Sequence, residues 1–273
     1  MRFSTTITNS NIIGKPLGDI LDKVTASGFD AVDFPGEPDI YPLAAAKDIL
    51  ASYARELPVA EVTACINPAR SLMNPDEKAR RKAVDYVKYC IDAASGLGVK
   101  LTHACFITTA EILQKTAPPA LERAALASLM TLAKHAKDAG VRLMLEPLFS
   151  GDNTIVKTAD KAVALFSKAL GMDVETFMHG QKDFGLLLDI FHMHNEEPDM
   201  LKAIRDHAAI TMHVHVADNV RSLDFTRADS AFVRSAVAAF RDKGYAGCLS
   251  FESFHPSINF DVLKAALRII KSY

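Results

Sequence analysis

Cysteine is scarce in this chain of 273 residues, and its spacing matches no metal-binding motif. There are four cysteines, no two of them form a Cys-x-x-Cys pair, and tryptophan is absent. This spacing excludes a zinc-finger type of site. We therefore predict a cytoplasmic protein with reduced thiols in its core, at Cys65, Cys90, Cys105 and Cys248.

Long apolar runs and a strong charge of either sign are also missing. No run approaches the roughly 20 apolar residues of a membrane helix, and the N-terminus, Met1 to Ser4, lacks the apolar segment of a signal peptide. The formal net charge is −2, so there is no basic field to attract nucleic acid. We expect neither a membrane nor a nucleic-acid partner.

Short apolar runs alternate with longer amphipathic ones along the whole chain. Hydrophobic residues make up 49% of the sequence, which is enough for one large core, and no linker marks a second domain. Eight strand–helix units in strict alternation predict an α/β fold, a single (β/α)8 TIM-barrel domain over residues 1–273. The expected strands are Phe3–Ile7, Phe29–Phe34, Val59–Ile66, Val99–Phe106, Val141–Glu146, Gly185–Ile190, Ile210–Val216 and Cys248–Phe251.

Glycines and capping residues predict where the helices between these strands begin and end. Gly28 follows a helical spacing of apolar residues and is expected to end that helix. Asn74 is expected to cap a long helix, with Glu77 in the position of a capping box. The expected helices are Pro16–Ala26, Tyr41–Glu56, Asn74–Ser95, Pro118–Ala139, Thr158–Leu170, Glu196–His207, Ser230–Lys243 and Phe260–Ser272.

Four consecutive strands in the second half of the chain end on a side chain that can bind a metal ion. In TIM barrels the chemistry lies at the carboxyl ends of the strands. Strand alternation places all four side chains inside the barrel, with their apolar neighbours facing the helices. The four residues are Glu146, Asp189, His215 and Glu252.

Three carboxylates that converge on one point repel each other unless a cation lies among them. Oxygen-rich ligands with one imidazole suit Mn²⁺ best, with Mg²⁺ and Co²⁺ as alternatives. The sequence therefore predicts a divalent metal site. For Asp189 taken alone, a helix cap or a surface ion pair would explain the carboxylate equally well.

The other histidines have simpler interpretations. His213 shares the inward face of its strand with His215 but lies one layer deeper, so we interpret it as a supporting or core residue. A core position with satisfied hydrogen bonds is favoured for His103, although it could line the pocket. His194 is expected to face solvent. Surface positions are also expected for His135, His179 and His207.

Five stretches of the chain carry a resemblance to a known family. The most specific is the run Leu188-Asp189-Ile190-Phe191-His192-Met193. The others are Gly28-Phe29-Asp30 to Gly36-Glu37-Pro38, Asn74-Pro75-Asp76 to Gly98, Leu145-Glu146-Pro147-Leu148, and His213-Val214-His215 to Arg221. With these motifs the chain resembles the xylose isomerase-like barrels, and within them the ketose 3-epimerases typified by D-tagatose and D-psicose 3-epimerases.

Carried over residue by residue, the resemblance implies a role for each of seven side chains. Glu146 and Glu252 are implied to act as an acid–base pair. His192 and Arg221 match positions that contact substrate hydroxyls. Asp152 stands where the family has a glutamate that helps to hold His192 and the substrate. The implied metal ligands are Glu146, Asp189, His215 and Glu252.

The loops that shape the pocket depart from the family pattern. Phe149-Ser150-Gly151 stands where Asn-Arg-aromatic is usual, and Ser222-Leu223-Asp224-Phe225 stands where the family often has Pro-Gly-x-Gly. These departures leave the identity of the substrate open, while the metal-binding and acid–base positions keep the family pattern.

The residue types suit proton transfer on a sugar or keto-polyol. A divalent cation polarises the carbonyl, which acidifies the hydrogen on the next carbon and stabilises the enediolate that forms. One glutamate would remove the proton and the other would return it on the opposite face, which is epimerisation. The predicted activity is that of a metal-dependent ketose 3-epimerase or related sugar isomerase in carbohydrate metabolism.

Other activities fit parts of the same pattern. A dehydratase of a keto-inositol or shikimate-type compound begins with the same proton removal and then expels a β-hydroxyl, and a hydroxypyruvate-type isomerase is a further alternative. A non-catalytic sugar-binding barrel would bind sugar without exchange of solvent hydrogen. An abasic-site endonuclease would need several more ligand histidines, and the first half of the chain has only His103 and His135. By analogy with the family we expect a homodimer or homotetramer, with Glu196–His207 as a candidate interface.

Overall fold

The computed structural model describes residues 1–9, 11–180 and 182–273, and its eight strands form one parallel sheet. Strands that follow one another in sequence are neighbours in the sheet, in the order β1-β8-β7-β6-β5-β4-β3-β2. The strands are β1 (Arg2–Thr5), β2 (Val32–Pro35), β3 (Val59–Thr63), β4 (Leu101–Cys105), β5 (Arg142–Glu146), β6 (Phe184–Asp189), β7 (Thr211–Val216) and β8 (Cys248–Phe251).

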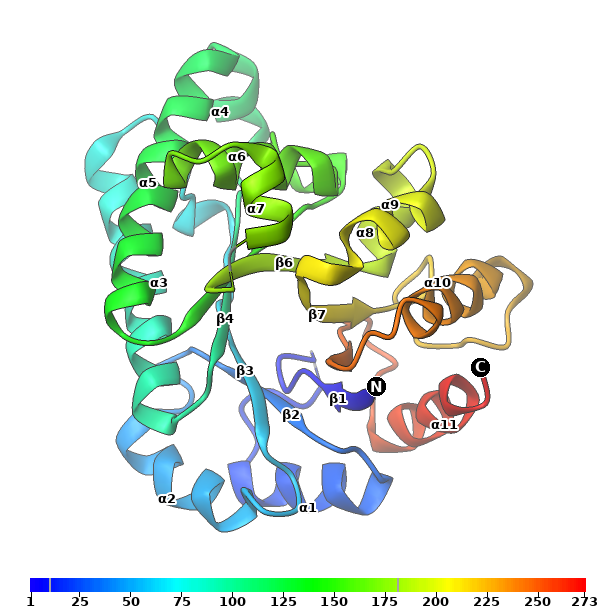
Figure 1. The fold of residues 1–273 in the computed structure, drawn as a ribbon. Coiled ribbons are helices and arrows are strands. Elements are labelled where there is room, and N and C mark those ends of the chain that lie inside the picture. The colour runs from blue at the N-terminus through cyan, green and yellow to red at the C-terminus, as the bar shows by residue number, and fades with distance from the viewer. Residues whose placement is uncertain (10, 181) are drawn as a thin grey trace.

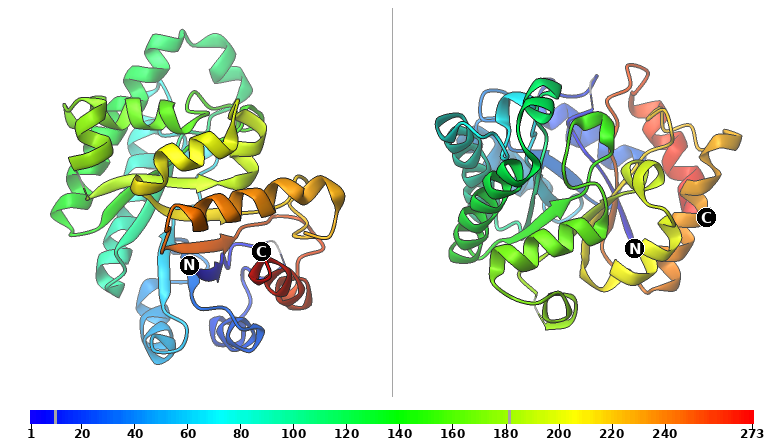
Figure 2. Two further views of the ribbon diagram at one scale, coloured as in Figure 1. Left: turned by 45° about the vertical axis from the view of Figure 1, so that its right-hand side comes forward. Right: turned by 90° about the horizontal axis from the view of Figure 1, so that it is seen from above.

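A narrow contact between β1 and β2 nearly closes the sheet into a cylinder. Thr6, just beyond β1, forms an isolated parallel bridge with Asp33 of β2, and the Ile7 N–H donates to the Asp33 carbonyl at 3.2 Å. The strands surround a central axis and the helices lie outside them (Figures 1 and 2). The predicted (β/α)8 TIM barrel is confirmed.

Helices on the outside of the sheet present apolar faces to it. In α1 the buried side chains recur at i, i+3, i+4 and i+7 from Leu17 to Val24. Gly28 ends this helix with φ 87°, a left-handed conformation that glycine adopts without strain, as predicted. The helices are α1 (Leu17–Ser27), α2 (Leu43–Tyr53), α3 (Glu77–Leu97), α4 (Ala110–Lys115), α5 (Pro118–Asp138), α6 (Ala159–Leu170), α7 (Val174–Gly180), α8 (Ile190–Glu196), α9 (Met200–His207), α10 (Ala231–Asp242) and α11 (Phe260–Lys271).

The predicted cap of the long helix α3 was wrong. The cap is Asp76, whose carboxylate accepts a hydrogen bond from the Ala79 N–H at 2.7 Å. Asn74 instead accepts from the Asp76 N–H at 2.9 Å. The residue before a proline is disfavoured in helical conformation, so Asn74 stays in the turn ahead of Pro75.

The helix expected over Glu196–His207 begins four residues later than predicted, and a separate helix ends at Glu196. α8 follows β6 directly and ends at Glu196, and α9 begins at Met200. Pro198, which lies between them, has no N–H to continue the first helix. Asp199 caps α9 by accepting from the Lys202 N–H at 2.9 Å.

His207 is buried, so the expectation of a surface position was wrong. Its Nε2 lies 3.0 Å from Asp160 Oδ1, and its Nδ1 lies 2.8 Å from the Ala203 carbonyl oxygen. It is one turn beyond Ala203, on the face of α9 that turns toward the core. The other three histidines expected on the surface are exposed or partly exposed: His135, His179 and His194.

The four cysteines are free thiols, as predicted. Three of them are buried, but Cys65 is partly exposed, so the prediction of a core position was wrong for that residue. The reason is its place just after β3, at the open end of the barrel.

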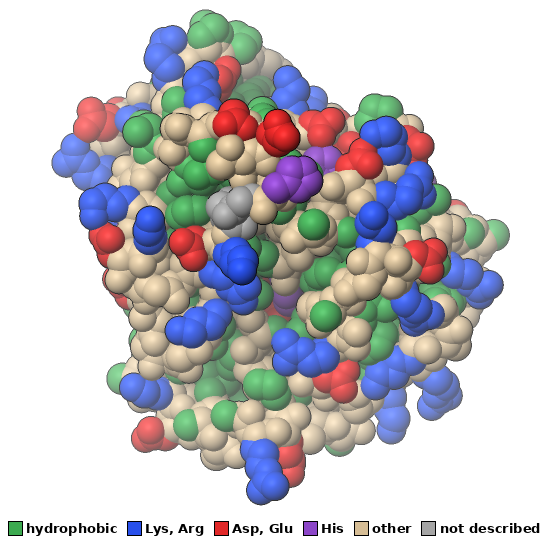
Figure 3. All heavy atoms as spheres, in the orientation of Figure 1, with side chains coloured by type: hydrophobic (Ala, Val, Ile, Leu, Met, Phe, Trp, Pro, Cys, Tyr) green, Lys and Arg blue, Asp and Glu red, His purple; other side chains and the backbone are tan. Residues whose placement is uncertain are grey.

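The outer surface carries charges of both signs. On the face shown in Figure 3, Lys and Arg side chains are interspersed with Asp and Glu side chains. Within the described ranges, no helix is long and apolar enough to cross a membrane.

Gly185 lies where β6 passes close to the chain that enters β7, and it should not tolerate a side chain. A Cβ atom at this position would lie 2.4 Å from the carbonyl oxygen of Ile210 and 2.9 Å from Met212 Cε. We expect Gly185→Ala to lower the free energy of unfolding by about 1–3 kcal/mol, as overpacking of a core does. Denaturant titration would measure the change.

Gly96→Ala is the matched control for this substitution. Gly96 lies in α3, and a Cβ there would meet its nearest neighbour, Leu43 Cδ2, at 3.7 Å. We expect this variant to be unchanged or more stable by about 0.5–1 kcal/mol, because alanine favours a helix over glycine. Equal stability of the two variants would contradict the packing argument at Gly185.

Candidate active site

The four predicted metal ligands meet at the carboxyl end of the barrel. Each offers one ligand atom, and these atoms all lie within 4.8 Å of one another. Neighbouring strands bring them together in register, since Asp189 of β6 is paired with His215 of β7. All four are buried: Glu146, Asp189, His215 and Glu252.

His215 stands between the two glutamates. Its Nδ1 lies 3.6 Å from Glu146 Oε1 and 3.6 Å from Glu252 Oε2. Among the described residues, neither Glu146 Oε1 nor either ring nitrogen of His215 has a hydrogen-bond partner. Buried polar atoms without partners are costly, and a cation among these atoms would remove that cost. The donor set therefore fits a divalent metal ion.

Asp189 serves the helix and the site at the same time. Its Oδ1 accepts from the Phe191 N–H at 2.7 Å and caps α8. Its Oδ2 faces the other side and contacts Arg221 at 2.5 Å. The helix cap considered for this residue and the predicted site position are therefore both present, one on each oxygen.

Arg221 brings a positive charge to the three carboxylates. Its Nη2 lies 2.5 Å from Asp189 Oδ2 and 3.4 Å from Glu252 Oε2. The guanidinium also lies over the ring of Phe191, 4.4 Å from the centroid. Burial lowers the pKa of Arg221, but the carboxylates of Asp189 and Glu252 raise it, and the net shift is upward. The side chain thus remains a cation that offsets part of the negative charge.

The loop after β7 holds Arg221 in an unusual backbone conformation. Arg221 and Leu223 have φ values of 56° and 61°, in the left-handed region that such residues rarely adopt. Asp218 stabilises this turn by accepting from the Leu223 N–H at 2.9 Å and from the Ser222 hydroxyl at 2.7 Å. Strained backbone held in this way is common at binding sites.

Glu252 is held as a carboxylate anion. Burial by itself raises the pKa of Glu252, but the nearby His215 and Arg221 outweigh that effect and lower it below the usual range. The same contact acts on the imidazole: burial lowers the pKa of His215, and Glu252 and Glu146 raise it well above the usual value. An ionised carboxylate can bind a cation or accept a proton.

His192 points its Nε2 toward the site. Its Nδ1 accepts from the Phe149 N–H at 3.2 Å, so a neutral ring carries its proton on Nε2. That nitrogen lies 3.5 Å from Asp189 Oδ2 and 3.9 Å from Glu146 Oε1. Asp152 Oδ2 is 3.8 Å from His192 Nδ1, which is too long for a hydrogen bond. The Phe149 backbone, rather than Asp152, therefore orients the ring in this structure.

A pocket of about 230 Å³ opens over these residues. Five of the seven predicted site residues line it, and Asp189 and His215 lie beneath them. Burial raises the pKa of Asp152, which is half-buried at the pocket. A further wall comes from β3, β4 and the segments that follow them, and sequence reasoning had not included its residues Thr63, Cys65, Asn67 and Cys105. His103 also lies in this wall, so the less favoured of its two interpretations, a place at the pocket, is the one that the structure shows.

The comparison with known families agrees with this fold. The family described as xylose isomerase-like TIM barrel matches residues 21–273 of the chain. The protein belongs to the xylose isomerase-like TIM barrel family. The resemblance seen in the sequence motifs is therefore confirmed.

Several proteins that the chain resembles are named as epimerases. A ketose 3-epimerase of Arthrobacter globiformis is 24% identical over 241 residues, which are 87% of this chain and 78% of that protein. An L-ribulose 3-epimerase of Mesorhizobium japonicum is 37% identical over 133 residues, 48% of this chain and 40% of that protein. The structure of D-psicose 3-epimerase with D-tagatose from Clostridium cellulolyticum H10 superposes with a TM-score of 0.81 at 19% identity, covering 100% of this chain and 99% of that one.

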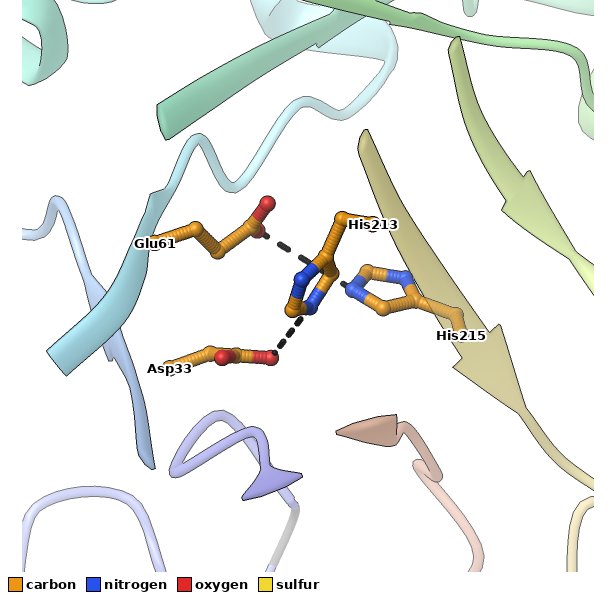
Figure 4. A group of neighbouring side chains, drawn as sticks. All are labelled: Asp33, Glu61, His213 and His215. Carbon is orange, nitrogen blue, oxygen red and sulfur yellow. Dashed lines mark hydrogen bonds and ion pairs between the residues drawn. The ribbon is translucent and has the colours of Figure 1, made fainter. Parts of the chain in front are cut away.

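This member of the family has a second buried polar group, one layer deeper in the barrel. Asp33 of β2 and Glu61 of β3 point toward His213 and His215 of β7 (Figure 4). In this group each carboxylate has an imidazole at hydrogen-bonding distance, since Asp33 Oδ2 lies 3.0 Å from His213 Nε2 and Glu61 Oε1 lies 3.0 Å from His103 Nδ1.

The two groups differ in their contacts and in their access to the pocket, and this difference indicates which one suits a metal ion. The upper group consists of Glu146, Asp189, His215 and Glu252. In it the His215 ring lies 3.6 Å from each glutamate, so an ion has room to replace these contacts. The lower group is only partly satisfied, because Asp33 Oδ1, Glu61 Oε2 and His213 Nδ1 have no hydrogen-bond partner among the described residues. It differs from the upper group in its access to the pocket, which Glu146 and Glu252 line and Asp33, Glu61 and His213 do not. The upper group is therefore the better candidate for a metal centre, because it opens to the pocket. The deeper position predicted for His213 is also where the structure places it.

Sequence reasoning missed Asp33 and Glu61. Each is the one acidic residue of its strand, and a buried valine stands beside it, Val32 in β2 and Val62 in β3. The same alternation that was applied to the second half of the chain would have placed both carboxylates inside the barrel.

Proposed function

We propose that this protein is a ketose 3-epimerase that depends on a divalent metal ion. The observation that carries the proposal is the pair of buried glutamates, Glu146 and Glu252, which flank His215 at equal distances at the base of a pocket of about 230 Å³. Two carboxylates beside a cation site are the groups that removal and return of a proton require. The similarity to enzymes named ketose, L-ribulose and D-psicose 3-epimerase supports a sugar as the substrate.

The metal ion in this proposal is held by Glu146, Asp189, His215 and Glu252, and Mn²⁺ suits this oxygen-rich set best. When bound, it would polarise the substrate carbonyl and stabilise the negative charge of the enediolate. Asp189 is fixed for this task by the helix cap on its other oxygen.

The protein side chains divide the remaining work. One glutamate takes the proton from the carbon beside the carbonyl, and the other returns a proton from the opposite face. His192 offers Nε2–H to a substrate oxygen, because its Nδ1 is already bonded to the Phe149 N–H. Arg221 donates to the hydroxyls near the reacting carbons, and Asp152 contacts the substrate at the edge of the pocket.

Deuterium exchange would test this function directly. A panel of fructose, psicose, tagatose, sorbose and ribulose is incubated in D₂O with the protein and catalytic Mn²⁺, and chelator removes the ion before proton NMR. We expect deuterium at the carbon beside the carbonyl together with a new sugar for at least one ketose. Protein treated with chelator from the start is the control and should show neither.

Three outcomes would reject the proposal. No exchange with any ketose by the metal-loaded protein would exclude the epimerase. Release of water with a conjugated chromophore from a cyclic keto compound would favour a dehydratase. Tight sugar binding without exchange would favour a binding protein.

A homo-oligomeric state and a cytoplasmic location stay predictions.

A further inference from the structure

One wall of the pocket carries polar side chains for which the proposed mechanism has no task. His103 of β4 and Thr63 of β3 both line the pocket, on the two strands that follow β5 in the order of the sheet. His103 is 3% exposed, so its ring is almost completely enclosed and has little freedom to turn. A buried imidazole at a pocket wall requires hydrogen-bond partners for both nitrogens.

Glu61 holds these two side chains from behind. Its Oε1 accepts from the Thr63 hydroxyl at 3.0 Å and lies 3.0 Å from His103 Nδ1. Glu61 is completely buried, and a carboxylate in such a position is costly unless it is compensated. The Thr63 hydroxyl and the His103 ring supply part of that compensation and hold the carboxylate in place behind the pocket wall.

The contact with Glu61 sets the direction of the His103 ring. Nδ1–H donates to the carboxylate, in the neutral ring and in the protonated ring alike. Nε2 is thereby turned to the other side, where it lies 3.8 Å from Glu146 Oε2. That distance is too long for a hydrogen bond, so Nε2 remains available to a molecule in the pocket.

His103 does not belong to the set of candidate metal ligands. The ligand atoms that lie within 4.8 Å of one another come from Glu146, Asp189, His215 and Glu252. Glu61 nevertheless connects the two side chains, since its Oε1 also lies 3.9 Å from His215 Nε2. Figure 4 shows Glu61 directed toward His215 from β3. A carboxylate behind a metal-binding histidine orients that histidine in many metal sites.

We propose that His103 is a substrate-binding residue, whose Nε2 contacts an oxygen of the bound ketose next to Glu146, and that Glu61 is its positioning residue. This inference rests on the proposed function and assigns the β3–β4 wall as a subsite for one hydroxyl of a polyhydroxy ketone. A hydroxyl can donate to a neutral imidazole and accept from a protonated one, so the contact persists in both states of the ring. His103 completes the set of polar groups around the reacting end of the sugar.

A comparison of substrate analogues tests the contact. Wild type and His103→Leu are assayed with the ketose that the wild type converts and with its monodeoxy analogues. We expect His103→Leu to lower kcat/KM by about 10- to 100-fold, the range for loss of a hydrogen bond in an enclosed site. The wild type should discriminate between the ketose and each monodeoxy analogue. The variant should lose this discrimination for the analogue that lacks the contacted hydroxyl and keep it for the others. Its affinity for Mn²⁺ should remain that of the wild type.

A spectroscopic measurement keeps the test independent of any variant. Histidine side-chain ¹H–¹⁵N spectra of the Mg²⁺-loaded wild type should show His103 protonated at Nδ1, and the ketose should shift its Nε2 resonance. The resonances of His213, which is bonded to Asp33 in the deeper layer, should not move and serve as the internal control. In Glu61→Gln the Nδ1 resonance should change and kcat/KM should fall by less than in His103→Leu, because the amide oxygen still accepts.

Several results would overturn the inference. An active wild type whose His103→Leu variant keeps the same kcat/KM and the same discrimination would exclude the contact. A parallel loss of Mn²⁺ affinity would make His103 a metal ligand instead. A wild type that converts no ketose at all rejects the proposed function, and the ligand assigned to this subsite falls with it. If His103→Leu does not fold, the analogue kinetics are measured with His103→Gln instead. The spectra of the wild type then test the contact without any variant.

Discussion

Glu252→Gln is expected to stop interconversion of the two epimers while one of them still exchanges hydrogen with solvent. Glutamine keeps the size of the side chain and can still offer an oxygen to a cation, but it cannot accept a proton. Because Glu252 is the anion held beside His215 and Arg221, its charge is the property that the substitution removes. We expect turnover to fall by about 10²- to 10⁴-fold, the usual contribution of a general base.

Glu146→Gln is the matched variant and makes the two-base assignment specific. If each glutamate serves one face of the substrate, one variant should exchange the hydrogen of one epimer and the other variant that of the second. Proton NMR in D₂O, started from each pure epimer, separates the two cases. Mn²⁺ affinity is measured alongside, so that a loss of metal is not mistaken for a loss of base.

The outcome that contradicts this assignment is equally clear. Substantial conversion by Glu252→Gln, or exchange of both epimers by that variant, would mean that one group serves both faces. A variant that binds Mn²⁺ as the wild type does and exchanges neither epimer would mean that Glu252 is needed before the proton is removed.

The upper layer of the site, formed by the four candidate metal ligands, could be predicted because each of them lies at or beside the carboxyl end of a strand. Glu146 and Asp189 each follow apolar residues whose alternation gives the direction of the side chain, and the structure places both inside the barrel. His192 and Arg221 depend on loops and a short helix, so only the family resemblance indicated them. Their contacts with Asp189 are results of the structure.

The deeper layer could not be predicted from spacing. A lone acid in an apolar strand indicates that a partner exists but does not say which one, and the partners lie far away in sequence. Asp33 and His213 are 180 residues apart, and Glu61 and His103 are 42 residues apart. Only the closure of the barrel brings these pairs together.

Short helices and buried helix ends were missed for a related reason. α4 and α7 have six and seven residues, too few to show a helical period in the sequence. His207 was misplaced because a histidine near the end of a helix is usually exposed, and here the core-facing side of α9 includes it. Local patterns carry no information about which end of a helix packs against the barrel.

Metal binding should stabilise the wild type and should fail in Asp189→Asn. A ligand that binds only the folded state at a hundred times its Kd adds about 2.7 kcal/mol to the free energy of unfolding. Asparagine caps helices as well as aspartate does, so Asp189→Asn should keep the hydrogen bond from the Phe191 N–H while it removes the charge at Oδ2. The variant should therefore fold, lose turnover and gain no stability from Mn²⁺.

Asp189→Ala separates the two roles of this carboxylate. It loses the ligand and also the cap of α8, which should cost a further 0.5–2 kcal/mol or so in the metal-free protein. Denaturant titrations of the three proteins, with chelator and with Mn²⁺, give both quantities. If Asp189→Asn were stabilised by Mn²⁺ as strongly as the wild type, Asp189 would be a helix cap alone. The metal would then have to be held by the two glutamates and His215, leaving Arg221 as the permanent partner of Asp189.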